Sequence, residues 1–585
     1  MRRLRLRGAC KTGGLCISQE LDRTTLDISP SPSLWSGAGV QTGVAGSEQV
    51  ADQIGQGQNK PVMSRRDLFS LIGTLAGSAV MYEAMNSLAY AGEAGYSGPP
   101  NLSGDVKGAS VLILGSGLAG MTAAYELRKA GYKVQILEYQ DRPGGRNWSL
   151  YGGDTYTELG GFTQHVGFDP GLYLNPGPWR IPYHHYGMLH YCKLLKVQLE
   201  PFIQTNFNAY VHSTKAFGGK PQRYRHVQAD YQGYVAELLA KSTRQNALDQ
   251  AVTKEDQEIL LSSLRQWGAL DKNYEYKMGE PSSGRRGFDA DPGGGLTSVP
   301  TPSQPFALKD VLQSGLWRAV AFSNGYETQQ SLFQPVGGMG MVGKAFGAEL
   351  KEVIQYNSKV VDIRQDGKGV TVTYQDTVKG GPPRQAKADW CICTIPVSVL
   401  SQIPITVGAP MQAAIANLSY ASSVKVGLQF KRRFWEEDEN IYGGITYTDQ
   451  PNSTIGYPNY GYFGSGKGVL LGAYAFGPAA FNLTALSPEE RIAKSLEYGS
   501  KIHPQYMQEF DNGASVAWHR VPWTLGCAGA WSEELRAQHY DNMCALDGRI
   551  MLAGEHASRI PAWQEGAVLS ALDAIRRLHQ RVLTA

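Results

Sequence analysis

Arg180 is the residue whose type and setting most strongly suggest ligand chemistry, and it lies in the stretch NPGPWRIPYHH at 175–185. Its guanidinium keeps its charge, so burial among aromatic and apolar neighbours is costly without an anionic partner. A planar guanidinium donates two parallel hydrogen bonds to a carboxylate. Gly177, Pro178 and Pro182 would stiffen the surrounding backbone, so little entropy is lost on binding. Arg180 therefore either binds a ligand carboxylate or forms a structural ion pair.

A nucleotide-binding pattern, GSGLAG, occupies residues 115–120, between a strand predicted at 110–114 and a helix predicted at 117–130. Glycines in this position let the backbone approach a pyrophosphate, which rests on the N-terminus of the helix. The next predicted strand, 133–138, ends in a glutamate that can bind the hydroxyl pair of a ribose. The pattern predicts a dinucleotide site formed by Gly115, Gly117, Leu118, Ala119, Gly120 and Glu138.

The residues after that strand read YQDRPGGRNWS (139–149), in which two glycines allow close backbone passage and Arg146 can reach a pyrophosphate. At this point the sequence resembles the FAD-dependent amine oxidase superfamily, where DRPGGR is a flavin fingerprint. The stretch RIMLAGEHAS (549–558) is similar to the last strand and turn of that family. The resemblance implies FAD as the cofactor, with Glu555 on the ribityl chain and the backbone of Val360 at the adenine.

The resemblance covers most of residues 108–585. It implies an α/β fold class, with a Rossmann-like FAD-binding domain, a second mixed-sheet substrate domain and a helical insertion. It also implies that the cofactor contacts Trp179, Arg180, Trp563 and Gln564.

Within the superfamily, the segment around Arg180 resembles the Gly-Pro-x-Arg-hydrophobic-Pro segment of L-amino acid oxidases, such as the snake-venom type. In that family the arginine binds the α-carboxylate of the substrate. The resemblance makes Lys425, in ASSVKVGLQFKRRFW, the lysine that holds a water against flavin N5. Tyr457, in TIGYPN, corresponds to a tyrosine that donates to the same carboxylate, and the alternative is a plain core tyrosine. Ala562 and Trp563 match a Gly-Trp pair that lines the flavin and the substrate.

The sequence departs from the family pattern in three places. About fifteen extra residues, FTQHVGFDPGLYLNP, precede the arginine segment, and Ala562 replaces a glycine. Ala528 stands where a larger apolar residue would contact the substrate side chain, which predicts a wider or differently shaped pocket. Trp518 and Trp523 are further candidates for the aromatic wall. His184 and His185 are open to two interpretations, as pocket residues or as hydrogen-bonded structural histidines.

The composition is that of an ordinary soluble protein. Of 585 residues, 42% are hydrophobic and 18% charged, and the formal net charge of +3 gives no indication of nucleic-acid binding. The seven cysteines are scattered and show no zinc spacing, so no metal is predicted. The predicted partners are a small L-amino acid and dioxygen.

The N-terminal part resembles an export address. Residues 63–91 combine a Ser-Arg-Arg opening, an apolar run at 68–81 and a small Ala-Tyr-Ala site, as in twin-arginine signal peptides. The apolar run is too short for a stable membrane anchor. We expect export by the twin-arginine machinery to the periplasm or the medium. Residues 1–62 are predicted to be a disordered extension or the product of a mis-called start.

The remaining chain is predicted to alternate between two domains. The FAD-binding domain comprises 108–165, 331–400 and 541–585, and the last part ends in a helix predicted at 563–583. Residues 166–330 form a substrate and helical domain, with helices near 232–240 and 254–268. Residues 401–540 form the substrate-binding sheet domain, in which apolar runs favour an antiparallel sheet.

Other functions remain compatible with these motifs. An amine or polyamine oxidase on the same fold would use Arg180 differently, and an amino acid monooxygenase would decarboxylate its substrate to an amide. A flavin-binding protein without turnover belongs to a different class. The sequence leaves open the preferred amino acid side chain and whether the chain forms a homo-oligomer.

Overall fold

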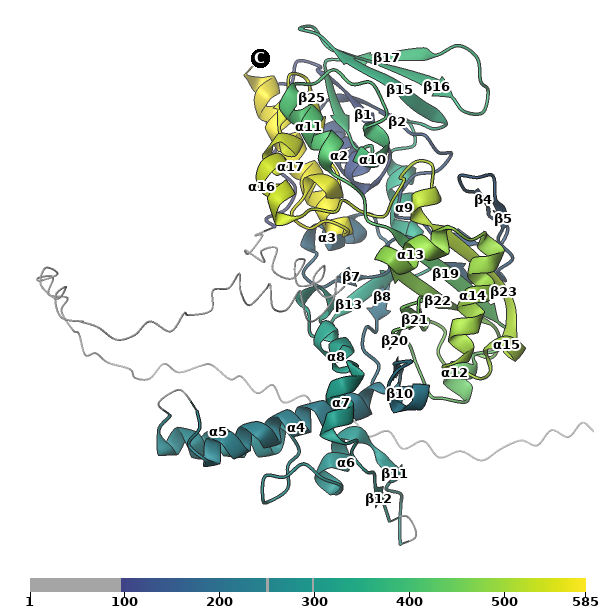
Figure 1. The fold of residues 1–585 in the computed structure, drawn as a ribbon. Helices are drawn as coiled ribbons and strands as arrows, with labels where there is room; N and C mark the ends of the chain where they lie inside the picture. Colours follow the sequence, from purple (N-terminus) through teal and green to yellow (C-terminus); the bar gives the residue numbers. More distant parts are fainter. Residues whose placement is uncertain (1–95, 249–251, 297–298, 585) are drawn as a thin grey trace, which may run out of the picture. The chain divides into compact units, whose positions relative to one another are not determined.

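A six-stranded sheet forms the centre of the nucleotide-binding part in the computed structural model, which describes residues 96–248, 252–296 and 299–584 (Figure 1). Its strand order is β14-β2-β1-β18-β25-β24, and every pair is parallel except the last. In that order the strands are Ile354–Gln355, Lys133–Leu137, Ser110–Leu114, Trp390–Cys393, Ile550–Leu552 and Leu546–Asp547. The sheet therefore assembles from three separate parts of the chain.

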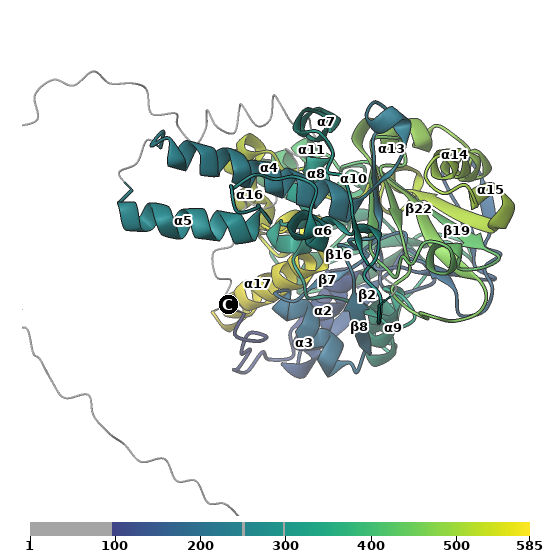
Figure 2. The ribbon, with the colours of Figure 1, turned by 90° about the horizontal axis from the view of Figure 1, so that it is seen from below.

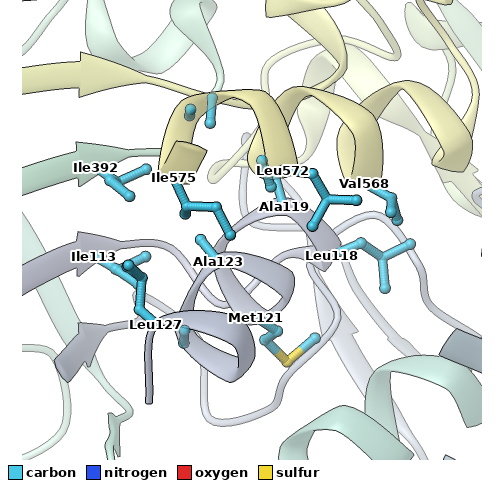
Figure 3. Packing of buried hydrophobic residues seen from close by; sticks show 14 of the residues in the cluster. Ile113, Leu118, Ala119, Met121, Ala123, Leu127, Ile392, Val568, Leu572 and Ile575 are labelled. Carbon is cyan, nitrogen blue, oxygen red and sulfur yellow. The ribbon is translucent and has the colours of Figure 1, made fainter. Parts of the chain in front are cut away.

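Two helices cover one face of this sheet and meet in its main hydrophobic core. Helix α2 (Leu118–Lys129) follows β1, and α17 (Gln564–Leu583) follows β25 near the other end of the chain. Ala119 and Ala123 of α2 lie near Leu572 and Ile575 of α17 (Figure 3). Small side chains on one helix allow the larger ones on the other to interdigitate. The predictions of this strand and both helices are confirmed to within two residues.

The turn between β1 and α2 depends on glycine for close packing. A Cβ atom at Gly120 would lie 2.0 Å from the carbonyl oxygen of Gly115, so no side chain fits there. Gly115 itself has φ +103°, a left-handed conformation that favours glycine. The chain can thus pass from strand to helix within three residues, which places the first turn of α2 at the carboxyl end of β1.

A second, seven-stranded sheet has the strand order β10-β9-β20-β21-β22-β19-β23 (Figure 1). Its strands are Gln222–Arg223, Tyr210–His212, Ile445–Thr448, Thr454–Gly456, Gly468–Phe476, Ser423–Phe430 and Phe510–Ala517. The predicted antiparallel arrangement holds for every pair except β20 and β9, which are parallel. That pair joins strands more than two hundred residues apart, and such long-range pairing leaves no local signal in the sequence.

Alternation along β19 separates the two faces of the second sheet. Val424, Val426 and Leu428 pack into a core with α13 (Gly477–Thr484) and α14 (Pro488–Ser500). Successive side chains in a strand point to opposite faces, so Lys425 and Gly427 belong to the other face. That face is the one turned toward Trp179, whose ring lies 5.5 Å from the Lys425 ammonium.

Helices occupy much of the region between 186 and 323. Helices α4 and α5 pack side by side (Figure 2), which confirms the helices predicted near 232–240 and 254–268. The helices here are α3 (Tyr186–Leu194), α4 (Tyr224–Arg244), α5 (Lys254–Trp267), α6 (Glu280–Arg286), α7 (Leu308–Ser314) and α8 (Trp317–Ser323).

Two three-stranded sheets and several short helices complete the fold. The sheet β7-β13-β8 comprises Ile181–Pro182, Leu332–Pro335 and Leu199–Phe202, and the sheet β15-β16-β17 comprises Ser358–Gln365, Val370–Asp376 and Arg384–Ala388. Further helices are α9 (Gly340–Glu349), α10 (Val397–Leu400), α11 (Ala409–Asn417), α12 (Phe434–Glu437), α15 (Tyr506–Glu509) and α16 (Glu533–Cys544).

The predicted N-terminal segments, 1–62 and 63–91, lie outside the described residues. Within the described ranges, no helix combines the length and the apolar character that crossing a membrane requires.

We expect Gly120→Ala to lower the free energy of unfolding by about 1–3 kcal/mol, the usual cost of overpacking, because its methyl group collides with the backbone of the β1–α2 turn. Urea unfolding followed by tryptophan fluorescence measures the change. Gly284→Ala in α6 is the matched control, since its added Cβ meets no atom within 4 Å. Equal stability of the two variants would contradict this account of the turn.

Candidate active site

A central cavity of about 770 Å³ lies where the two sheet systems meet. Its walls come from the β1–α2 turn, the 144–147 and 176–178 loops, the second sheet and the start of α17. The cavity brings together nine residues that the sequence analysis selected: Gly117, Leu118, Ala119, Arg146, Trp518, Glu555, Ala562, Trp563 and Gln564.

The start of α2 fits a pyrophosphate. A Cβ atom built on Gly117 would meet nothing within 4 Å, so the backbone here faces open space that a ligand can approach closely. The helix has no side-chain cap at Gly117 and no acidic residue in its first turn. Its free N–H groups and positive dipole end are therefore available to an anion.

Glu138 braces the glycine turn in the structure. Its carboxylate accepts hydrogen bonds from the backbone N–H of Ser116 at 2.6 Å, from the Ser116 hydroxyl at 2.8 Å and from Gln140 N–H at 2.8 Å. Burial raises the pKa of Glu138, and these three donors act against that rise. The predicted contact with a ribose stays a prediction, as does the adenine contact of Val360, which lies on β15 opposite Tyr374.

Arg146 and Glu555 form an ion pair across the cavity, with 2.7 Å between Nη1 and Oε1. Arg146 also donates to the carbonyl oxygen of Cys527 at 2.7 Å. Burial opposes the charge on both groups, but their attraction prevails, so the pKa of Glu555 falls and that of Arg146 rises. Arg146 and Glu555, both predicted to bind the cofactor, thus hold one another's side chains in place in the cavity wall.

Arg180 lies against Trp563, with the guanidinium carbon 5.2 Å from the ring centroid. Its Nε is buried and has no hydrogen-bond partner, and the described part of the chain offers Arg180 no ion pair. The structural ion pair considered from the sequence is therefore absent among these residues. A guanidinium that lacks an anion in this setting can accept one from a ligand, and its predicted contact with a substrate carboxylate stays a prediction.

Lys425 is fully buried beneath the loop that carries Arg180. Its Nζ donates to the carbonyl oxygens of Asn175 at 3.1 Å and Gly177 at 2.6 Å, and it lies 4.2 Å from the ring centroid of Tyr474. Burial lowers the pKa of Lys425 from 10.5 to about 7, and the charge of Arg180 adds to this effect. The ammonium therefore holds the loop and is poised to lose its proton near neutrality.

The structure does not bring Tyr457 to Arg180. The Tyr457 hydroxyl is bonded to Thr446 Oγ1 at 2.8 Å and His503 Nε2 at 2.7 Å, inside the core beneath the sheet. Tyr457 also borders a second cavity of about 410 Å³ together with Trp179. Another tyrosine, Tyr447, accepts a hydrogen bond from Gln204 Nε2 at 2.8 Å, and the charge of Arg180 acts against the burial that raises its pKa.

The sequence selected Tyr457 and not Tyr447, because only Tyr457 lies in the Tyr-Pro-Asn motif that carries the family resemblance. Strand β20 is only four residues long, and such a short strand carries too little alternation to show which face a tyrosine occupies.

The remaining predicted residues lie at different depths. Ala562 lines the cavity with φ +68°, and its N–H donates to Glu555 Oε2 at 3.1 Å. Gln564 donates to Asn147 Oδ1. Trp179 packs edge-on against Tyr474, at 5.9 Å between centroids. Ala528 is buried and is not among the residues of the cavity wall, so its contact with a substrate stays a prediction.

The aromatic wall contains one of the two tryptophans proposed for it. Trp518 lines the cavity and donates from Nε1 to the Pro176 carbonyl oxygen at 2.8 Å. Trp523 packs instead with Trp148, at 5.9 Å between ring centroids. Tyr474 is a wall residue that the sequence analysis missed, although its position opposite Lys425 in the β19–β22 pair follows from strand register.

The cavity runs from a helix N-terminus suited to pyrophosphate toward the ring of Trp563, as expected of an oxidoreductase that binds an extended dinucleotide. The particular family follows from the sequence: residues 118–579 match the family described as flavin containing amine oxidoreductase. The chain belongs to this family, and its cofactor is FAD. The family resemblance inferred from the motifs is confirmed.

Relatives and solved structures agree with this assignment. The L-amino-acid oxidase of Siganus canaliculatus is 28% identical over 480 residues, covering 81% of this chain and 86% of the relative. The L-amino-acid oxidase of Vipera ammodytes ammodytes is 25% identical over 482 residues, covering 80% and 92%. Cyclohexylamine oxidase from Brevibacterium oxydans IH-35A has a TM-score of 0.53 at 16% identity, over 81% of this chain and 99% of that one. This likeness confirms the fold class.

We expect Lys425→Met to change how stability depends on pH. In the unfolded chain the Lys425 pKa is near 10.5, so between about pH 7 and 10.5 the unfolded state binds more protons than the folded one. The free energy of unfolding therefore gains up to about 1.4 kcal/mol per pH unit from this residue across that window. The variant lacks this gain, and its stability relative to the wild type falls as the pH rises.

Urea unfolding of both proteins at several pH values within that window measures the difference. Lys359→Met, at an exposed position of β15, is the matched control and should follow the wild type throughout. A constant stability difference between Lys425→Met and the wild type over the window would contradict the lowered pKa.

Proposed function

We propose that the protein oxidises L-α-amino acids with dioxygen and water, releasing a 2-oxo acid, ammonia and hydrogen peroxide. The observation that carries this proposal is Arg180, a cation beside Trp563 with a buried Nε that lacks a hydrogen-bond partner. An α-carboxylate supplies the missing anion and accepts two parallel hydrogen bonds from the guanidinium. The names of the two L-amino-acid oxidase relatives point in the same direction.

Bound FAD supplies the redox chemistry, accepting a hydride from the substrate and passing the electrons to dioxygen. The protein positions the reactants. Arg180 fixes the carboxylate end of the substrate, and Trp563 lines the cavity next to it. Desolvation in this aromatic setting favours the neutral amine over an ammonium, which prepares the substrate for oxidation. No strong side-chain base is then required.

Lys425 has two roles in this proposal. As an ammonium it ties the carbonyl oxygens of Asn175 and Gly177, and so fixes the loop that leads to Arg180. Its lowered pKa, about 7, also lets it hold or release a proton at Nζ near neutral pH. Proton supply beside the cofactor assists the formation of hydrogen peroxide.

We expect Arg180→Ala to raise the KM for L-amino acids by about 100-fold, the usual scale for losing a desolvated charge pair, while FAD stays bound. Steady-state oxygen consumption measures KM and kcat, and the flavin absorbance measures cofactor content. The decarboxylated amine of the same side chain is the substrate control, because it lacks the group that Arg180 binds.

Arg265→Ala, at an exposed position of α5, is the matched control variant and should leave both constants unchanged. An unchanged KM for amino acids in Arg180→Ala would refute the carboxylate assignment. Preferential turnover of the amine by the wild type would identify an amine oxidase instead.

We further propose that the holoprotein is exported through the twin-arginine route. The Ser-Arg-Arg opening at 64–66 and the following apolar run support this proposal. Replacing Arg65 and Arg66 by lysines in the full chain should retain the flavoprotein in the cytoplasm of a bacterial host, as cell fractionation would show. Lys359→Met, which leaves the signal intact, is the export control. Undiminished export of the paired variant would contradict the proposal.

A further inference from the structure

Two histidines and a glutamate converge beside Arg180. A turn closed by a hydrogen bond from His185 N–H to the Pro182 carbonyl oxygen, at 3.0 Å, brings the adjacent rings of His184 and His185 to 4.9 Å between centroids. Glu327, on the short helix η2 (Tyr326–Thr328), meets both rings. Its Oε2 lies 2.8 Å from His185 Nε2 and 3.3 Å from His184 Nε2.

The hydrogen bonds around His184 are incomplete. Its side chain is 8% exposed, yet neither ring nitrogen has a hydrogen-bond partner. The ring stacks on Tyr326 at 3.9 Å between centroids, which fixes its plane and leaves Nε2 turned toward Glu327. A buried imidazole whose Nδ1 has no partner, and whose Nε2 has only the 3.3 Å contact with Glu327, costs free energy unless another ligand satisfies it.

The charges around the cluster favour a cation. Glu327 places one carboxylate oxygen, Oε2, against both imidazole rings. A second carboxylate, Glu565, faces the same histidines while it accepts hydrogen bonds from the N–H groups of Gly187 and Met188. Two carboxylates beside the same pair of imidazole rings supply the negative charge and the oxygen and nitrogen ligands that a divalent cation needs.

We propose that His184, His185 and Glu327 bind a divalent first-row transition metal, with Zn²⁺ as the best fit. Two imidazole nitrogens and one carboxylate oxygen form a ligand set that this ion prefers, and the three ligand atoms lie within 4.8 Å of one another. Ligand atoms bound to one tetrahedral Zn²⁺ are about 3.3 Å apart, close to the distance between His184 and Glu327.

The fourth coordination position is open to water. Glu327 keeps 21% of its side chain exposed, whereas His185 is 2% exposed and closes the other side against Trp563, at 5.1 Å between ring centroids. An ion can therefore enter from the Glu327 side without disturbing the central cavity. This site is independent of the substrate proposed above, because none of its ligands has a part in binding the carboxylate.

Titrating the untagged holoprotein, dialysed against a chelator and then freed of it, with ZnCl₂ in a calorimeter tests the proposal. We expect one Zn²⁺ per chain with a dissociation constant of about 1 μM or below, as for a preformed three-ligand site. Co²⁺ should give visible absorption at wavelengths beyond the flavin bands, which reports tetrahedral coordination directly. His184→Ala and Glu327→Gln should each weaken Zn²⁺ binding by about 100-fold or more.

His165→Ala, which removes an exposed histidine from the short strand β5 (Thr163–His165), is the matched control and should bind Zn²⁺ as the wild type does. Flavin absorbance of each variant shows whether it has folded, and Glu327→Gln keeps the size of the side chain if His184→Ala does not fold. Zn²⁺ binding that survives in both folded cluster variants would overturn the assignment. Failure of the wild type to bind Zn²⁺ or Co²⁺ would overturn it as well.

Discussion

The ion pair between Arg146 and Glu555 holds the catalytic part of the molecule together. It joins residues 409 positions apart, and both lie in the wall of the central cavity. Removing one member of a buried pair leaves an uncompensated charge, at a cost of about 3–5 kcal/mol. Glu555 also accepts from Gly529 N–H at 3.3 Å and Ala562 N–H at 3.1 Å. One carboxylate thus links the 144–147 loop, the backbone at Gly529 and the segment that leads into α17.

Two basic residues, Arg180 and Lys425, lie near that wall and influence one another. Arg180 and Lys425 lie close enough for each to oppose the charge of the other, and the described residues give neither an ion pair. The lowered pKa of Lys425 reduces its positive charge near neutral pH, and its Nζ donates hydrogen bonds to the loop carbonyl oxygens. Arg180 cannot lose its charge in this way, because a guanidinium keeps its proton. Arg180 therefore places a fixed positive charge against Trp563 in the cavity wall, and the anionic ligand group proposed above would offset the cost of burying it.

Local sequence signals predicted most of the fold because their physics is local. Gly115, Gly120 and the apolar alternation of β1 fix the nucleotide turn within a dozen residues, and the periodicity of 563–583 predicts α17. Side-chain direction on short strands depends on register with distant partners. Tyr457 therefore lies in the core, where its hydroxyl is bonded to His503 Nε2, and not at Arg180. The meeting of His185 with Glu327 across 142 positions likewise needs the tertiary structure.

Ala562 shows how a single departure from the family pattern acts through the backbone. The similar family has glycine there, and the structure explains why: φ is +68°, a left-handed conformation that costs a residue with a Cβ about 1–2 kcal/mol. The hydrogen bond from Ala562 N–H to Glu555 helps to hold this conformation. Its methyl group adds bulk to the wall next to Trp563, whereas Ala528 is buried outside the wall. The pocket therefore differs from the family pattern next to Trp563, where the proposed substrate backbone would lie. The conformational cost at Ala562 is offset by its hydrogen bond to Glu555, the same carboxylate that binds Arg146.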